Sequence, residues 1–165
     1  MRLIALSLMV LTMGSSARAE VLSTVASVQV QIGPELQAKA ARDLGERDVA
    51  RLAATLKGDV QRELERTGVL AGGRLELVLT DVRPSRPTLQ QLSNRPGLSH
   101  ESFGIGGATL EGQAISVAGD VTPIHFRWYA DDIEDAPRKA TWTDAYAAFD
   151  RFAYRFGRGE SYATR

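Results

Sequence analysis

The chain contains 165 residues, of which 44% are apolar and 24% charged, and its 20 basic residues balance its 20 acidic residues. This length and composition are those of one ordinary globular domain. Because the formal net charge is zero, no nucleic-acid partner is expected. The chain has no cysteine, which excludes disulfides, thiolate metal sites, a cysteine nucleophile and a lipid attached through a cysteine.

Residues 1–19 have the features of a secretory signal peptide. A basic residue follows the initiator, and residues 3–13 form an apolar run of 11 residues, which is too short to cross a bilayer. Ala17-Arg18-Ala19 matches an A-x-A cleavage site of bacterial style. The sequence therefore predicts cleavage between Ala19 and Glu20. The mature protein is then soluble, without a membrane span, and periplasmic or secreted. An uncleaved anchor or a buried core helix is the alternative.

Four segments have the periodicity of regular secondary structure. Residues 23–32 alternate apolar and polar side chains, which predicts a strand with one wet face. Residues 48–67 place their apolar side chains on one helical stripe, and residues 142–156 do the same with an aromatic stripe. Residues 74–83 predict a second strand, with three leucines on its inner face.

Residues 103–133 predict a long β-hairpin. With a three-residue loop, 118–120, apolar side chains of both arms share one face, and Asp120 takes the left-handed conformation of the loop. A two-residue loop would instead place the carboxylate of Glu111 against Trp128. The three-residue loop predicts the pairs Leu110–Trp128, Gly112–Phe126, Ala114–Ile124 and Glu111–Arg127.

The predicted elements follow the order β-α-β-β-β-α. Because the strands alternate apolar and polar side chains, one face of the sheet is expected to be wet. We expect an α+β fold, a two-layer sandwich of a four-stranded, mostly antiparallel sheet with two helices on one face and the hairpin at its centre. The single domain spans residues 20–157, and residues 158–165 form a loose C-terminal tail.

Residues 84–102 form an unusually long connection that contains three prolines. Such loops in compact domains are often functional or disordered, and here a solvated crossover pinned by the prolines is the alternative. Leu89 and Leu92 are expected to anchor one short turn to the body. The candidate ligand contacts in this connection are Arg86, Asn94 and Arg95.

The polar face of the hairpin is the other candidate site. Hydrogen-bonding side chains that converge on a rigid sheet can hold a carboxylate or a sugar, although many sheets have a polar face with no ligand. The candidate residues are Glu111, Gln113, His125, Arg127 and Tyr129.

The sequence contains no recognisable catalytic set. Its two histidines, His100 and His125, belong to no metal-binding or hydrolase motif. No metal, no cofactor and no catalytic residue is therefore predicted.

The runs LELVLTDVRPSRPTLQQL, FGIGGATLEG, RWYADDI and TWTDAYAAFDRFA resemble sequences of uncharacterised exported proteins of proteobacteria. The resemblance covers most of the mature chain, and it implies export and a shared fold. It implies no activity and no site residues.

Two classes of function follow. The first is a non-enzymatic periplasmic domain that binds a small polar ligand, an envelope component or a protein partner. The alternative is a small periplasmic hydrolase that uses acidic residues such as Glu111 or Asp131, which would need paired carboxylates in a deep cleft.

Overall fold

The structure is a computed structural model that describes residues 26–160. The predicted signal peptide, its cleavage site and residues 161–165 of the predicted tail lie outside the described residues. The strands are β1 (Ser27–Ile32), β2 (Arg74–Arg83), β3 (Gly107–Ile115) and β4 (Val121–Tyr129). The helical segments are α1 (Pro34–Lys39), the π-helical turn η1 (Ala40–Leu44), α2 (Glu46–Thr67), α3 (Leu89–Asn94), the 3-10 turn η2 (Ala136–Arg138) and α4 (Thr143–Phe156).

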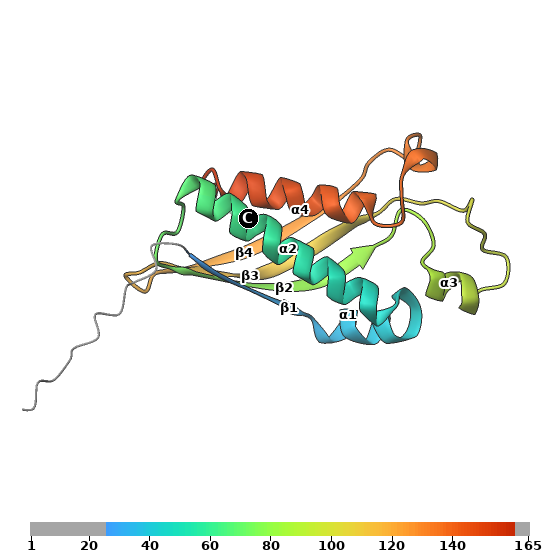
Figure 1. Ribbon diagram of the computed structural model, residues 1–165, viewed down its shortest axis with the longest axis horizontal. Coiled ribbons are helices and arrows are strands. Elements are labelled where there is room, and N and C mark those ends of the chain that lie inside the picture. The colour runs from blue at the N-terminus through green and yellow to red at the C-terminus, as the bar shows by residue number, and fades with distance from the viewer. Residues whose placement is uncertain (1–25, 161–165) are drawn as a thin grey trace, which may run out of the picture.

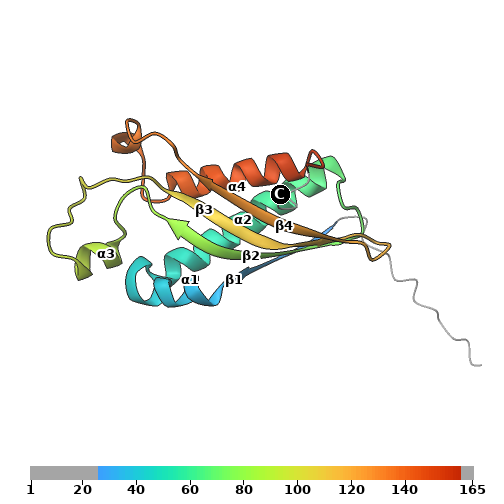
Figure 2. The ribbon, with the colours of Figure 1, turned by 180° about the vertical axis from the view of Figure 1, so that it is seen from behind.

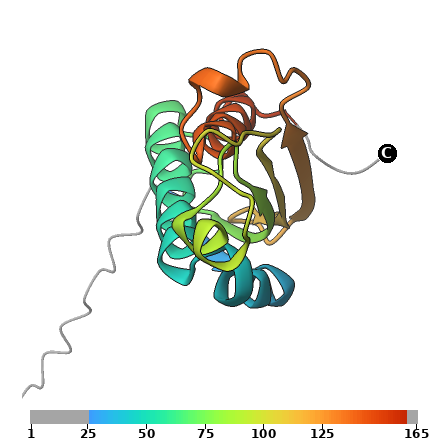
Figure 3. The ribbon, with the colours of Figure 1, turned by 90° about the vertical axis from the view of Figure 1, so that its right-hand side faces the viewer.

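The four strands form one mixed sheet in the order β1-β2-β3-β4, in which β1 and β2 are parallel and the other pairs antiparallel. Helices α2 and α4 lie side by side on one face of it (Figure 1), and the view along the sheet shows the two layers (Figure 3). No long helix of residues 26–160 covers the other face (Figure 2). The predicted α+β sandwich is confirmed. The hairpin, however, is not central, because β4 is an edge strand.

Helix α2 forms because its apolar residues repeat at helical spacing on one stripe. All six residues of this stripe are buried against the sheet and α4, and Leu52 and Leu56 are fully buried. The helix ends at Gly68, which has φ of +71°, a conformation that costs glycine little. The predicted helix over residues 48–67 is confirmed, with two further residues at its start.

Helix α4 supplies the aromatic part of the core. Phe149 and Phe152 are fully buried, and the ring of Phe152 lies 5.4 Å from that of Phe126 on β4. Tilted aromatic pairs at this distance are favourable. The aromatic stripe of this helix therefore packs on the sheet, as its spacing predicts.

The hairpin register differs from the predicted one by two residues. Ile115 pairs with Val121, so the loop has five residues, 116–120, and its left-handed residue is Gly119 rather than Asp120. A shift of two residues returns every side chain to the same face, so face alternation cannot distinguish the two registers. The loop is instead fixed by its own hydrogen bonds, from Ser116 N–H to Asp120 O and from Asp120 N–H to Ser116 Oγ. The observed pairs are Ala108–Trp128, Leu110–Phe126, Gly112–Ile124 and Glu111–His125.

This register places Gly112 where no side chain fits. A Cβ atom at this position would lie 2.0 Å from the carbonyl oxygen of Glu76 on β2, and the backbone φ is +156°. We predict that Gly112→Ala lowers the free energy of unfolding by about 2–4 kcal/mol, because β2 and β3 must separate to admit the methyl group. Urea unfolding of the purified variant measures this loss.

Gly104→Ala is the matched control. A Cβ atom at Gly104 meets no atom within 4 Å, so this variant should differ from the wild type by less than about 0.5 kcal/mol. Equal stability of the two variants would contradict the close approach of β2 and β3 at Gly112.

Candidate functional site

The five predicted residues of the hairpin lie on the open face of the sheet, and their described contacts are local. Glu111 and His125 face each other, with 3.6 Å between Oε1 and Nδ1. Gln113 donates a hydrogen bond to Glu76 (2.8 Å). The guanidinium of Arg127 lies 5.3 Å from the ring centre of Tyr129. The five side chains are thus divided among separate contacts with one another and with residues of β2, and they do not converge on one place.

A β-bulge adds a residue to this face that the sequence did not reveal. The pairing of β2 with β3 shifts between Leu79 and Asp81, so Asp81 lies on the open side while Val82 remains fully buried. Bulges commonly redirect a side chain in this way. Asp81 accepts hydrogen bonds from Lys39 Nζ and from the Tyr129 hydroxyl, both at 2.7 Å.

These contacts determine the protonation states of Asp81 and Tyr129. Burial alone raises the pKa of a carboxyl, but hydrogen bonds from Lys39 and Tyr129, with the charge of Arg83, lower the pKa of Asp81 below its ordinary value. Burial raises the pKa of the Tyr129 phenol, and the hydrogen bond to Asp81 raises it further. Asp81 therefore stays an anion, and the Tyr129 hydroxyl keeps its proton near neutral pH.

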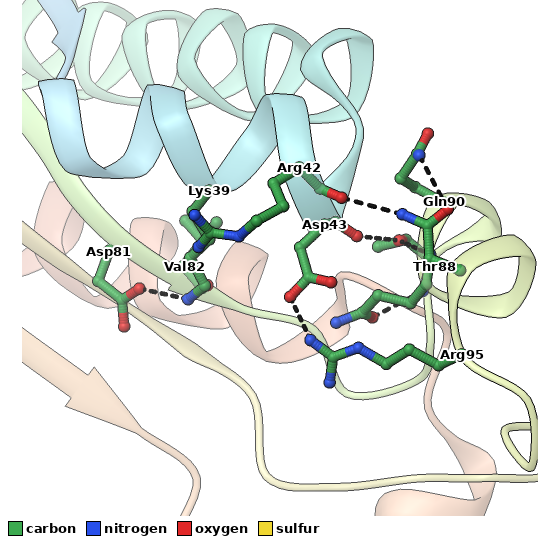
Figure 4. A network of polar contacts seen from close by, with 10 residues as sticks. Lys39, Arg42, Asp43, Asp81, Val82, Thr88, Gln90 and Arg95 are labelled. Carbon is green, nitrogen blue, oxygen red and sulfur yellow. Dashed lines mark hydrogen bonds and ion pairs between the residues drawn. The ribbon is translucent and has the colours of Figure 1, made fainter.

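The predicted residues Asn94 and Arg95 lie on the crossover segment, which we define as residues 84–106, between β2 and β3. Asn94 Nδ2 donates to the carbonyl of Arg42 (2.9 Å), and Arg95 forms an ion pair with Asp43. Both partners belong to η1, beside which the segment packs (Figure 4). The two side chains therefore attach the crossover segment to the body of the protein.

The third predicted residue of this segment, Arg86, holds its other side. Its guanidinium donates to the backbone carbonyls of Lys139 (2.6 Å), His100 (2.8 Å) and Pro137. These acceptors are neutral, and among the described residues Arg86 forms no ion pair with a carboxylate. Its positive charge is therefore not compensated by an adjacent anion.

Thr88 anchors the short helix α3 where Leu89 was predicted to do so, whereas the other predicted residue, Leu92, is partly buried. Leu89 is 75% exposed, whereas Thr88 is 2% exposed. The Thr88 hydroxyl accepts from the N–H of Gln91, and the Gln91 side chain accepts from the N–H of Thr88, which is a capping box. The connection is thus neither disordered nor folded over the hairpin. In the described structure none of its hydrogen bonds reaches His125.

A buried carboxylate fixes the two ends of the crossover segment. Asp144, which is 2% exposed, accepts from Ser85 Oγ (2.9 Å), the N–H of Gly106 (3.0 Å) and Lys139 Nζ (2.9 Å). Ser85 is fully buried, so its hydroxyl serves this contact. Burial alone would raise the pKa of Asp144, but the hydrogen bonds together lower it.

An open pocket of about 430 Å³ lies between η1, the end of β2 and the crossover segment. Among residues 26–160, its charged lining consists of four cations and one carboxylate: Lys39, Arg83, Arg86, Arg95 and Asp43. Arg83, whose side chain is 56% exposed, lies 3.5 Å from Asp81, a carboxylate that it shares with Lys39. We name this site the basic pocket. Its excess of positive charge favours the binding of an anionic ligand.

The open face of the sheet has a second depression, of about 420 Å³, lined by Gln29, Gln31, Glu76 and Gln113 among others. The described polar side chains of this depression include one carboxylate and no cation. Within residues 26–160, no group of three or more acidic residues and histidines could hold a metal ion.

Comparison of the chain with protein-family models, with curated proteins and with solved structures finds no match.

The sequence suggested only part of the basic pocket. The sequence predicts Arg86 and Arg95 as ligand contacts because of their chemistry. Lys39 and Arg83 belong to no sequence motif, and only the fold brings them to the pocket. The signal for Arg83 was its position as the last residue of a strand that leads into a long loop, since ligand-binding residues are often found at such places.

The contact of Asp144 with Lys139 makes stability depend on pH. The pKa of Asp144 is lower in the folded protein than the ordinary 3.8, so its stabilising effect is full above that value and is lost as the pH falls through the folded pKa. We predict that Asp144→Asn lowers the free energy of unfolding by about 1–3 kcal/mol at neutral pH. The difference from the wild type should shrink as the pH falls from about 5 toward about 2.

Urea unfolding of both proteins across this pH range measures the effect, and Asp135→Asn is the matched control. Asp135 is an exposed residue that pairs with Arg138 at 3.7 Å, so its replacement should change stability by less than about 0.5 kcal/mol. Parallel pH profiles for the wild type and Asp144→Asn would contradict a charged, stabilising Asp144.

Proposed function

We propose that this protein is an exported, non-enzymatic binding domain that holds a small anionic ligand in the basic pocket. One observation supports this proposal above the others: among the described residues, four cationic side chains and a single carboxylate line the pocket. The volume of about 430 Å³ lies within the range of about 300–1,000 Å³ for small-molecule sites.

Arginine suits this role because its planar group offers paired donors that match a carboxylate or phosphate. Arg83 is the residue best placed to contact a ligand. Its guanidinium also lies 4.6 Å from the ring centre of Tyr129, which restrains it without using all its donors. Arg86 contributes its charge to the pocket lining, and three carbonyl oxygens hold its guanidinium in place.

The small hydrolase remains the alternative proposal. Glu111 has a side chain that is 55% exposed, and Asp131 is also exposed, so neither lies in a deep cleft. Among the described residues the carboxyl with a raised pKa is Asp59, through burial and the nearby charge of Asp150. Asp59 belongs to α2 and lines a depression between α2 and α4, and neither Glu111 nor Asp131 lines that depression. The non-enzymatic proposal needs no such pair.

Export is the second part of the proposal, and it rests on the cleavage motif at residues 17–19. In the described part of the chain no helix has the length and apolar character needed to span a bilayer. The proposed location is the periplasm or the medium.

We predict that the full chain, expressed in a bacterial host, yields a protein that starts at Glu20. Ala19→Arg should leave residues 1–19 attached, because the cleavage site needs a small residue there, whereas Ser15→Ala should be processed normally. Intact-mass measurement of the envelope and medium fractions tests this, and a wild-type mass that includes Met1 would contradict export by cleavage.

Anion binding is tested by calorimetric titration of the purified protein with inorganic phosphate and acetate at constant ionic strength. We predict that Arg83→Gln weakens binding about tenfold, the effect of losing about 1.4 kcal/mol of charge-assisted hydrogen bonding. Arg51→Gln, at an exposed position on α2, is the control of equal charge and should bind like the wild type.

Arg127→Gln distinguishes the basic pocket from the open face of the sheet. Arg127 and Arg83 both lie against the ring of Tyr129, but only Arg83 lines the pocket. Loss of binding in Arg127→Gln with normal binding in Arg83→Gln would contradict the proposal and move the site to the sheet.

A further inference from the structure

The basic pocket is also lined by apolar side chains that the fold leaves uncovered. Leu98, Phe103 and Ile105 belong to its lining, and they are 36%, 47% and 40% exposed. Leu44, which is 1% exposed, lines the same pocket as part of the core. A group of exposed large apolar side chains often marks a binding site, whereas single scattered ones are common on any protein surface.

Two of the cationic side chains, Lys39 and Arg83, come from outside the crossover segment, whereas Arg86 and Arg95 share that segment with the exposed apolar side chains. Lys39 ends α1 and Arg83 ends β2, whereas the exposed apolar residues all lie between positions 98 and 105 of the crossover segment. Hydrogen bonds hold this segment at Ser85, Arg86 and Gly104. A ligand in the pocket can therefore contact both cationic and apolar side chains.

We propose that the ligand is an amphiphilic anion, a carboxylate or phosphate that carries an alkyl chain. This inference rests on the proposed function, because it concerns the same pocket. The anionic group lies at Arg83 and Lys39, and the chain lies along Leu98, Phe103 and Ile105. The volume of about 430 Å³ accommodates one such molecule.

The experiment is a calorimetric titration of the purified protein with straight-chain carboxylates from butanoate to dodecanoate, each below its micelle-forming concentration. Affinity should rise about twofold to fourfold for each added methylene, as for partial or complete burial of that group, and then level off when the pocket is full. The neutral 1-octanol should bind at least about tenfold more weakly than octanoate, which has a similar chain and a charge.

Two variants test the apolar side of the pocket. Phe103→Ser and Ile105→Ser should each weaken dodecanoate binding about fivefold or more and leave acetate binding unchanged. Both positions are partly exposed, so thermal unfolding should be nearly that of the wild type, and either variant alone suffices if the other is unstable. Val117→Ser, at a residue that is 75% exposed in the hairpin loop, is the control and should keep the full dependence on chain length.

Three results would overturn the inference. Equal affinity for every chain length would leave a site for short anions only, in which case the proposed function survives. Binding to vesicles that contain phosphatidylglycerol, without binding of the dispersed carboxylates, would make this surface a membrane contact instead. Absence of binding to any anion would remove both the inference and the proposed function.

Discussion

The buried carboxylate of Asp144 joins three chain segments that are distant in the sequence. It accepts hydrogen bonds from Ser85 after β2, from Gly106 before β3 and from Lys139 before α4. A buried carboxylate without hydrogen-bond donors would lower the stability of the folded protein. The three segments are therefore held in the one arrangement that supplies these donors. The glycine is also required here, since a Cβ atom at Gly106 would lie 2.7 Å from Ser85 Oγ.

The basic pocket depends on this arrangement. The crossover segment is fixed at both ends by Asp144 and along its length by Arg86 and Thr88. The side chains that it contributes to the pocket are therefore held on an ordered backbone. A site that is already formed loses less conformational freedom when a ligand binds, which favours affinity. The sheet and the two long helices supply the support, and the site lies where β2 ends.

The regular elements could be predicted from the sequence because they follow from local periodicity. The register of the hairpin could not, because two registers that differ by two residues present the same faces. The position of Asp81 depends on a bulge, and that of Asp144 on contacts with residues 38 and 59 positions earlier. Arg86, Asn94 and Arg95 were expected to bind a ligand, and their described contacts are with the protein itself. Arg86 and Arg95 nevertheless line the basic pocket and add their positive charge to it.

The most direct test of the assignment is a two-dimensional ¹H–¹⁵N NMR titration of the purified protein with octanoate. If the ligand occupies the basic pocket, the largest changes in amide chemical shift will fall in residues 39–44 and 83–105. Residues 121–129 of β4 should change little. The largest changes in β4 and the outer positions of β3, with little change in the crossover segment, would contradict the assignment and place the site on the open face of the sheet.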